Sequence, residues 1–289
     1  MLRWPPTGEV IRLNDSPDRR SPAPGHSDEN RPSEISEAAI ARRLRAAGCV
    51  FAEDEARLLV GSGATPGDLA VLVERRVDGE PLEAILGWAE FCGLRIAVAP
   101  GVFVPRRRTE LLARQAARLS RPGSVVVDLC CGSGAVGTAV AVAVPGVRLY
   151  AADIEPAAVA CARVNVEPAG GRVFQGDLYA ALPDALLGRI DILAVNAPYV
   201  PTEHIASMPP EARLHEPRVS LDGGDDGLDV QRRVVAGAGR WLAGSGHVLI
   251  ETSRRQAPQT AALLEGAGLL TRVVRDDDVG GTVVIGSRG

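Results

Sequence analysis

The feature that most constrains the fold is an alternation of short apolar runs and longer amphipathic stretches after Ser124. Helical-length stretches such as 156–166 and 228–242 separate most of the runs. The alternation predicts an α/β fold, a mainly parallel sheet with helices on both faces. The runs have the composition of strands and cover Val125–Leu129, Leu149–Asp153, Arg172–Gln175, Ile190–Val195, His247–Glu251 and Thr282–Gly286.

The chain of 289 residues is long enough for a second, smaller unit. Residues 1–34 are rich in Pro, Ser, Asp, Asn and Arg and lack periodic apolar positions, which predicts a disordered leader. Residues 35–87 carry apolar positions at helical spacing, which predicts a small helical domain. Residues 88–104 contain two short apolar stretches around Cys92-Gly93, which predict a β-hairpin linker to the domain at 105–289.

Composition argues against several classes of protein. A formal net charge of −4 disfavours a broad surface for nucleic-acid phosphates. The five cysteines form no C-x-x-C pair and the four histidines are scattered, so we expect no metal site. No apolar run approaches the roughly 20 residues of a membrane span, and the N-terminus lacks a signal-type core. The cytoplasm is the expected compartment.

A glycine-rich loop, Asp128-Leu-Cys-Cys-Gly-Ser-Gly134, follows the first strand and opens a helix. Glycines at such a turn let the backbone approach a ligand closely. The next strand ends at Asp153, where a carboxylate can accept both hydroxyls of a ribose. Gly176-Asp177 closes the third strand, and the carboxylate of Asp177 can reach an adenine amino group. The spacing predicts a cofactor that contains adenosine.

Two cofactors fit an adenosine site, NAD(P) and S-adenosylmethionine. A pyrophosphate requires G-x-G-x-x-G with helix N–H groups aimed at its anionic oxygens. Here an acid, Asp128, precedes the glycines and suits the ammonium of a methionyl group. We therefore favour S-adenosylmethionine over NAD(P).

A second motif, Asn196-Ala-Pro-Tyr199, directly follows the fourth strand, at the edge where open α/β sheets bind ligands. A simple turn is the alternative interpretation. An amide nitrogen is a poor nucleophile, so its methylation depends on acceptors that orient the NH₂ group. The Asn196 side-chain oxygen and the Ala197 carbonyl can accept its two hydrogens, and Tyr199 can supply a flat wall.

With these motifs the chain resembles the HemK-type protein-(glutamine-N5) methyltransferases, from about Ser36 to the C-terminus. The resemblance implies a Rossmann-like class I S-adenosylmethionine-dependent methyltransferase that modifies the Gly-Gly-Gln glutamine of a class 1 peptide chain release factor. The resemblance also implies that the helical domain at 35–87 recognises the protein substrate. It implies no association with a membrane and no direct binding of nucleic acid. Further matching stretches are Glu80-Pro-Leu, Ile85-Leu-Gly, Phe91, Gly93-Leu, Pro100-Gly-Val, Pro105-Arg-x-x-Thr-Glu110, Glu216-Pro, Leu221–Leu228, Glu251 and Gln256.

The resemblance also implies which residues form the site. Beside Asp128 and Asp177, the cofactor contacts are Cys130, Cys131, Gly132, Ser133, Gly134, Asp153, Leu178 and Asn196. The substrate contacts are Asn196, Ala197, Pro198 and Tyr199, of which Asn196 and Tyr199 are the catalytic pair.

The chain departs from the family pattern at several positions. Ala197 replaces a proline, Cys130 a glycine and Leu178 an aromatic residue, and an arginine is missing after Asp278-Val-Gly. These departures leave open a paralogue with another protein substrate, or a weakened protein that still binds cofactor. An adenine-N6 nucleic-acid methyltransferase is the other alternative, because such a motif also binds an exocyclic amino group.

Overall fold

The computed structural model describes residues 36–289, so the leader predicted at 1–34 lies outside the described residues. The described chain divides into two compact units, residues 36–87 and residues 88–289. Among its helices none is long and apolar enough to cross a membrane.

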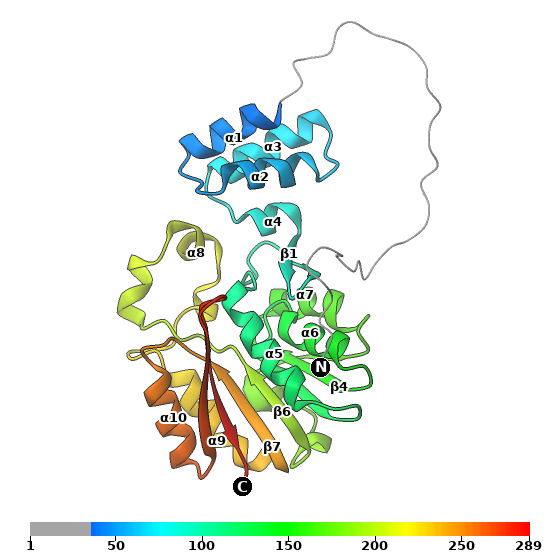
Figure 1. The fold of residues 1–289 in the computed structure, drawn as a ribbon, viewed down its shortest axis with the longest axis vertical. Helices are drawn as coiled ribbons and strands as arrows, with labels where there is room; N and C mark the ends of the chain where they lie inside the picture. The colour runs from blue at the N-terminus through cyan, green and yellow to red at the C-terminus, as the bar shows by residue number, and fades with distance from the viewer. Residues whose placement is uncertain (1–35) are drawn as a thin grey trace, which may run out of the picture. The chain divides into compact units, whose positions relative to one another are not determined.

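The smaller unit is entirely helical (Figure 1). Its helices are α1 (Glu37–Ala46), α2 (Ala52–Val60), α3 (Pro66–Val77) and α4 (Leu82–Leu86). The side chains of Ser36 and Thr65 cap α1 and α3 by accepting from backbone N–H groups of the first turn. The apolar positions at helical spacing form one core, which includes Ile40, Leu44, Leu59, Val73 and Ile85.

The larger unit is built on a seven-stranded sheet with the order β5-β4-β3-β6-β7-β9-β8 (Figure 1). The neighbouring strands from β5 to β7 are parallel, whereas β9 is antiparallel to both of its neighbours. The strands are β3 (Val125–Leu129), β4 (Arg148–Asp153), β5 (Arg172–Gln175), β6 (Ile190–Val195), β7 (Leu242–Glu251), β8 (Leu270–Asp276) and β9 (Gly281–Ser287).

Helices cover both faces of this sheet, which explains why the central strands are apolar at successive positions. Val126 of β3 packs into the core under α5, α6 and α7, whereas Val125 and Val127 pack into the core under α9 and α10. The helices are α5 (Glu110–Leu119), α6 (Ala135–Ala143), α7 (Pro156–Val166), α8 (Pro210–His215), α9 (Asp229–Trp241) and α10 (Ala257–Gly266).

A β-hairpin begins this unit, with β1 (Trp88–Phe91) antiparallel to β2 (Leu94–Ala97). Its apolar face packs into the same core as α5, α6 and α7. Asn165 of α7 anchors the hairpin, because its Oδ1 accepts from Ala97 N at 2.8 Å and its Nδ2 donates to the Ala97 carbonyl at 3.0 Å. The same Nδ2 donates to the Ser133 carbonyl at 2.8 Å, so the hairpin and the glycine-rich loop share one anchor.

The predicted α/β class and all six predicted strands are confirmed. The edge strand β8 was not predicted from the sequence, because Leu270 and Val273 are exposed and Arg272 and Arg275 interrupt its apolar residues. It also missed the short 3₁₀ turns, which are η1 (Arg107–Thr109), η2 (Leu178–Ala181), η3 (Asp184–Leu186), η4 (Thr202–Ser207) and η5 (Arg218–Ser220).

Candidate active site

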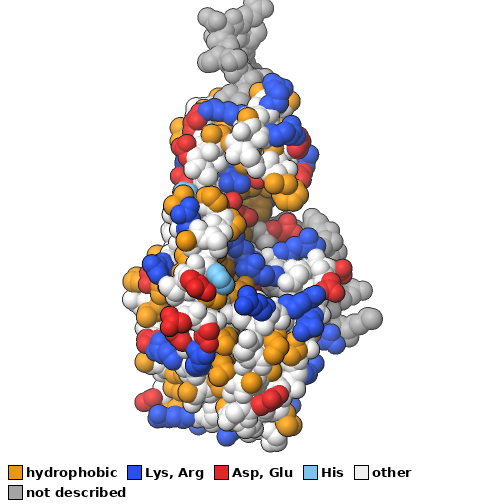
Figure 2. Space-filling model, turned by 90° about the vertical axis from the view of Figure 1, so that its left-hand side faces the viewer, with side chains coloured by type: hydrophobic (Ala, Val, Ile, Leu, Met, Phe, Trp, Pro, Cys, Tyr) orange, Lys and Arg blue, Asp and Glu red, His pale blue; other side chains and the backbone are white. Residues whose placement is uncertain are grey.

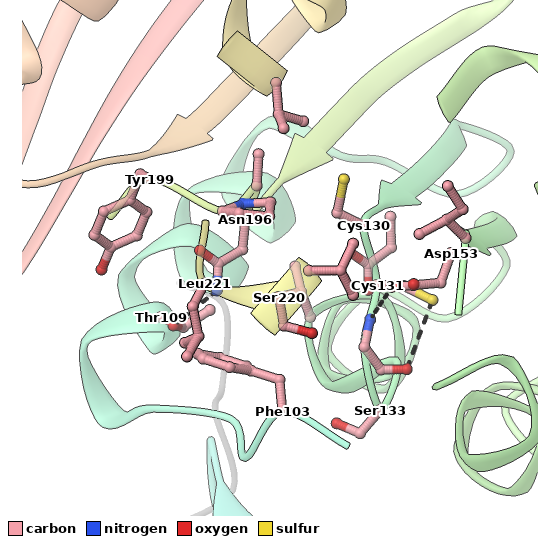
Figure 3. Close-up of a pocket in the computed structure, with 18 of the residues that line it drawn as sticks. Phe103, Thr109, Cys130, Cys131, Ser133, Asp153, Asn196, Tyr199, Ser220 and Leu221 are labelled. Carbon is pink, nitrogen blue, oxygen red and sulfur yellow. Dashed lines mark hydrogen bonds between the residues drawn. The ribbon is translucent and has the colours of Figure 1, made fainter. Parts of the chain in front are cut away.

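A cavity opens at the carboxyl ends of β3, β4 and β6, within the larger unit (Figure 3). This is the edge at which open α/β sheets bind ligands. The predicted site residues meet there, since all of them except Gly134 line the cavity: Asp128, Cys130, Cys131, Gly132, Ser133, Asp153, Asp177, Leu178, Asn196, Ala197, Pro198 and Tyr199.

Gly134 lies behind the lining and has a packing role. It is the N-cap of α6 with a φ of 75°, a left-handed value that favours glycine. A Cβ atom at this position would lie 2.6 Å from Val166 Cγ2 of α7. The glycine therefore lets α6 begin close to α7, which brings the preceding turn to the cavity.

Asp153, at the end of β4, is held by backbone hydrogen bonds and keeps part of its capacity to accept. Its Oδ2 accepts from Gly132 N at 2.8 Å (Figure 3), and its Oδ1 accepts from Glu155 N at 3.0 Å. Burial raises the pKa of the carboxyl, and the backbone N–H groups oppose that shift. A carboxylate accepts about four hydrogen bonds, so lone pairs remain for the two hydroxyls of a ribose.

Asp128, at the end of β3, is almost fully buried and lines the same cavity. Its Oδ2 accepts from Gly137 N at 2.8 Å in the first turn of α6. Burial raises its pKa to about 7, which the Gly137 N–H opposes and the nearby Asp153 reinforces. A buried carboxylate of this kind is stabilised by a cation, so the site fits the ammonium of a methionyl group.

Asp177 and Leu178 also line the cavity, and their contacts differ in part from the prediction. Asp177 Oδ2 accepts from Arg233 Nη2 of α9 at 2.6 Å. The carboxylate that was expected to bind the adenine amino group therefore also pairs with an arginine. Leu178 has a φ of 49°, which turns the chain at the start of η2. Its side chain packs against the sheet core and presents an apolar surface to the cavity.

The acceptor loop, residues 196–199, is tied to a second loop that follows η5. Val200 N donates to the Leu221 carbonyl at 3.0 Å, and Gly223 N donates to the Val200 carbonyl at 2.9 Å. Gln256 Nε2 donates to the Tyr199 carbonyl at 2.9 Å and to the Asp226 carbonyl at 3.1 Å. These bonds fix the backbone that carries Asn196 and Tyr199.

The side chains of Asn196 and Tyr199 contact residues for which no role was predicted from the sequence. Asn196 Nδ2 donates to Thr109 Oγ1 at 3.5 Å, a long bond (Figure 3). The Arg108 guanidinium lies 5.9 Å from the centre of the Tyr199 ring. Burial and the nearby Glu251 raise the pKa of Tyr199, so its phenol stays neutral. Thr109, Arg108 and Glu251 were given no role from sequence, because nothing local indicates their contact with residues 196–199.

Glu216 also lines the cavity. Its Oε1 accepts from Val104 N at 3.3 Å and from the side chain of Arg106. Burial raises its pKa, and the charge of Arg106 opposes the shift. In residues 36–289 no cluster of three or more His, Cys, Asp or Glu side chains could hold a metal ion.

Comparison with known proteins agrees with this geometry. The family described as "Methyltransferase small domain" matches residues 93–210. The chain is 37% identical over 228 residues to a release factor glutamine methyltransferase of Geobacter sulfurreducens, covering 77% of this chain and 79% of the relative. It is also 37% identical over 214 residues to a 4-amino-L-phenylalanine/4-methylamino-L-phenylalanine methyltransferase of Streptomyces pristinaespiralis, covering 72% and 73%.

A solved structure shares the fold. The methyltransferase of Pyrococcus furiosus is 15% identical and covers 76% of this chain and 96% of its own, with a TM-score of 0.52. The family is shown by the Geobacter sulfurreducens relative, because the two sequences are 37% identical over 77% of this chain. This chain belongs to the release factor glutamine methyltransferase family and is an S-adenosylmethionine-dependent methyltransferase.

Proposed function

We propose that this enzyme methylates the side-chain amide nitrogen of the glutamine in the Gly-Gly-Gln motif of a peptide chain release factor. The observation that carries the proposal is the orientation of Asn196, whose Nδ2 is directed at Thr109. Within residues 36–289 no group donates to its Oδ1, which leaves that oxygen for an incoming N–H group. The name of the Geobacter sulfurreducens relative supports the same acceptor.

The cofactor is held by the residues around the glycine-rich loop. S-adenosylmethionine, when bound, supplies an electrophilic methyl group on a sulfonium. Asp128 pairs with the methionyl ammonium, and Asp153 accepts from the ribose hydroxyls through its free lone pairs. Cys130, Cys131, Gly132 and Ser133 line the same cavity as these two carboxylates. Leu178 and Asp177 then contact the adenine face and its amino group.

The acceptor loop orients the glutamine amide. Asn196 Oδ1 accepts one hydrogen of the amide NH₂, and the Ala197 carbonyl accepts the other, so that the nitrogen lone pair is directed away from both. Pro198 and Tyr199 provide apolar surface against the planar amide. The nitrogen becomes acidic once methylated, and its surplus proton passes to water without a dedicated base.

We assign recognition of the protein substrate to the helical unit. Val50 and Phe51, between α1 and α2, are 83% and 69% exposed. Figure 2 shows charged side chains of both signs beside apolar ones on one face of this unit. Such a mixture suits contact with a protein better than contact with a phosphate backbone. A release factor substrate also places the enzyme in the cytoplasm.

The name of the Streptomyces pristinaespiralis relative supports a second candidate acceptor, an aromatic amine on a free amino acid. The adenine amino group of a nucleic acid is a third candidate, because it too offers two N–H groups. All three acceptors present a planar NH₂ group to Asn196.

One experiment separates these acceptors. The enzyme is incubated with S-adenosylmethionine that carries a labelled methyl group, and with a release factor, 4-amino-L-phenylalanine or RNA. The proposal expects label in the release factor and none in a release factor whose Gly-Gly-Gln glutamine is changed to alanine. Label in the free amino acid or the RNA, with none in the release factor, would refute it.

A further inference from the structure

The residues assigned to the adenine, Asp177 and Leu178, lie in a short turn rather than inside a strand or a long helix. Strand β5 ends at Gln175, and the η2 turn begins at Leu178. Leu178 has a φ of 49°, a left-handed value that is unfavourable for a residue with a Cβ atom. Such a conformation persists only where the surroundings hold it. Contacts from outside the turn must therefore fix this part of the cavity.

Tyr179, the next residue of the turn, packs against α9. Its hydroxyl donates to the Val234 carbonyl at 2.7 Å. Its ring stacks on the Trp241 ring, with the centroids 5.5 Å apart and the planes 15° from parallel. Tyr179 is not among the residues that line the cavity. Its side chain therefore contacts the helix rather than a bound cofactor.

Gly237 of α9 leaves the space that the Tyr179 ring fills. A Cβ atom at Gly237 would lie 2.3 Å from Tyr179 Cε2, far closer than van der Waals contact. In the described part of the chain, a Cβ atom at Gly239 of the same helix would meet no such neighbour within 4 Å. Glycine is unfavourable inside a helix relative to alanine, but only a glycine at position 237 accommodates the ring.

Hydrogen bonds inside the turn couple Tyr179 to the residues before it. Ala180 N donates to the Asp177 carbonyl at 3.0 Å, and Leu182 N donates to the Tyr179 carbonyl at 3.0 Å. A shift of the Tyr179 ring is therefore transmitted to the backbone of Asp177 and Leu178.

The same face of α9 reaches both the cavity and the turn. Val230 and Arg233 line the cavity and lie about two turns and one turn before Gly237. Arg233 Nη2 donates to Asp177 Oδ2 at 2.6 Å. Helix α9 therefore holds the turn at two points, the carboxylate of Asp177 and the ring of Tyr179.

We propose that Tyr179, packed against Gly237 of α9, is a positioning residue that keeps Asp177 and Leu178 in place for the adenine of the cofactor. This inference rests on the function proposed above, because it assumes that Asp177 and Leu178 contact the adenine. It concerns side chains behind the cavity and assigns no new step to the reaction.

Two glycine substitutions in one helix test the proposal. Gly237→Ala places a methyl group where the Tyr179 ring lies, whereas Gly239→Ala adds the same group to open space. The ligand is S-adenosylhomocysteine, which remains after the methyl group has left the cofactor, and its dissociation constant is measured by calorimetry. Gly237→Ala should weaken binding by about fivefold or more, because the ring and the turn must shift. Gly239→Ala should stay within about twofold of wild type.

Substitutions of Tyr179 show whether the effect passes through its ring. Tyr179→Leu removes the ring and should weaken binding by about fivefold or more. Adding Gly237→Ala to Tyr179→Leu should then change the dissociation constant by less than about twofold, because the methyl group no longer meets a ring. Tyr179→Phe keeps the ring and should stay within about threefold of wild type. If Gly237→Ala fails to fold, the Leu and Phe variants still give the comparison.

A second ligand reports on the adenine itself. It is an analogue of S-adenosylhomocysteine in which hydrogen replaces the adenine amino group. Wild type should bind S-adenosylhomocysteine about fivefold or more tightly than this analogue, because the amino group donates to the Asp177 carboxylate. The ratio of the two dissociation constants should fall toward one in Gly237→Ala and keep its wild-type value in Gly239→Ala and Tyr179→Phe. A general loss of stability in a folded variant would leave the ratio unchanged.

Two outcomes would overturn the inference alone. One is a wild-type affinity and ratio in folded Gly237→Ala and Tyr179→Leu. The other is an equal loss of affinity in Gly237→Ala and Gly239→Ala, because the helix rather than the ring would then matter.

These binding measurements need no methyl acceptor, so they separate the inference from the proposed reaction. Equal affinity of wild type for the two ligands would overturn the adenine contact and the inference together, but not the methylation of glutamine. If wild type methylates no glutamine but shows the expected binding ratios, the proposed reaction fails and the role of Tyr179 is supported.

Discussion

On the cofactor side of the cavity, the contacting groups are close in the sequence. Asp128 accepts from a backbone N–H nine positions later, and Asp153 accepts from one 21 positions earlier. On the acceptor side they are distant. The Asn196 side chain reaches Thr109 across 87 positions, and the Tyr199 carbonyl accepts from a side chain 57 positions later. Short stretches at the ends of neighbouring strands, each closed by a nearby backbone N–H group, therefore hold Asp128 and Asp153, whereas segments far apart in the sequence build the acceptor side.

This difference predicts that the two sides can be altered separately. A change at the acceptor loop should lower the rate of methylation more than the cofactor affinity. A change at Asp128 or Asp153 should do the reverse, because within residues 36–289 their side chains hydrogen-bond to backbone N–H groups of Gly132, Gly137 and Glu155 and not to residues 196–199.

The largest effect is expected from Asn196→Ala. It removes the acceptor that orients the amide in the transition state, so the methylation rate should fall by about 10²–10³, the scale for losing one preorganised polar group. Single-turnover kinetics at saturating cofactor measure this rate, and calorimetry measures the cofactor dissociation constant on the same preparation. A folded variant with the wild-type rate would show that the acceptor side does not depend on Asn196.

Asp153→Ala should act on the other side of the cavity. Loss of two ribose hydrogen bonds to a charged acceptor, each about 1.5–3 kcal/mol before water compensates, should weaken cofactor binding at least tenfold. Asp184→Asn, at an exposed position outside the cavity lining, removes the same formal charge and serves as the control. An Asp153→Ala dissociation constant within twofold of wild type, measured by calorimetry on folded protein, would reject the ribose contact.

Cofactor affinity should also depend on pH through Asp128. Because burial raises its pKa to about 7 in the free protein, Asp128 takes up a proton as the pH falls below that value and no longer pairs with an ammonium. Binding should weaken toward about tenfold per pH unit well below pH 7 and level off above it. Calorimetry from pH 5.5 to about 8.5 checks this. Asp128→Asn should bind weakly at all of these pH values, and an unchanged pH profile in that variant would exclude Asp128 as the cause.

The smallest effect is expected from Ala197→Pro, which restores the usual family residue. In residues 36–289 no group accepts a hydrogen bond from Ala197 N–H, and proline retains the carbonyl that the proposal uses. The rate should stay within about threefold of wild type or rise modestly through a stiffer loop. A large drop in melting temperature would show that the buried site cannot accommodate the ring.

The sequence predicted the cofactor side better because its signals are local. Val125, Val126 and Val127 are all buried, so β3 reads as a continuous apolar run, and the glycine-rich loop follows it directly. The edge strand β8 lacks such a run, because Leu270 and Val273 are exposed. Gly134 was predicted among the cofactor contacts because of its place in the loop, but its close approach to α7 appears only in three dimensions.

The supports of the acceptor side could not be derived from local pattern. Glu251 and Gln256 were noted only as matching the family, and their hydrogen bonds with Arg108 and the Tyr199 carbonyl depend on how β7 and α10 pack. One contact on the cofactor side, the ion pair between Asp177 and Arg233, depends likewise on the packing of α9 beside the end of the third strand. Long-range contacts of this kind require the fold to be known before any of them can be assigned.

The central claim, that the two sides of the cavity together methylate a glutamine amide, is tested most directly by tandem mass spectrometry. A release factor is incubated with the enzyme and cofactor, and the Gly-Gly-Gln peptide is fragmented. The account predicts one added methyl group on the glutamine side-chain nitrogen, and a far lower yield in the same incubation when the enzyme carries Asn196→Ala. A methyl group on another residue, or an equal yield with that variant, would contradict it.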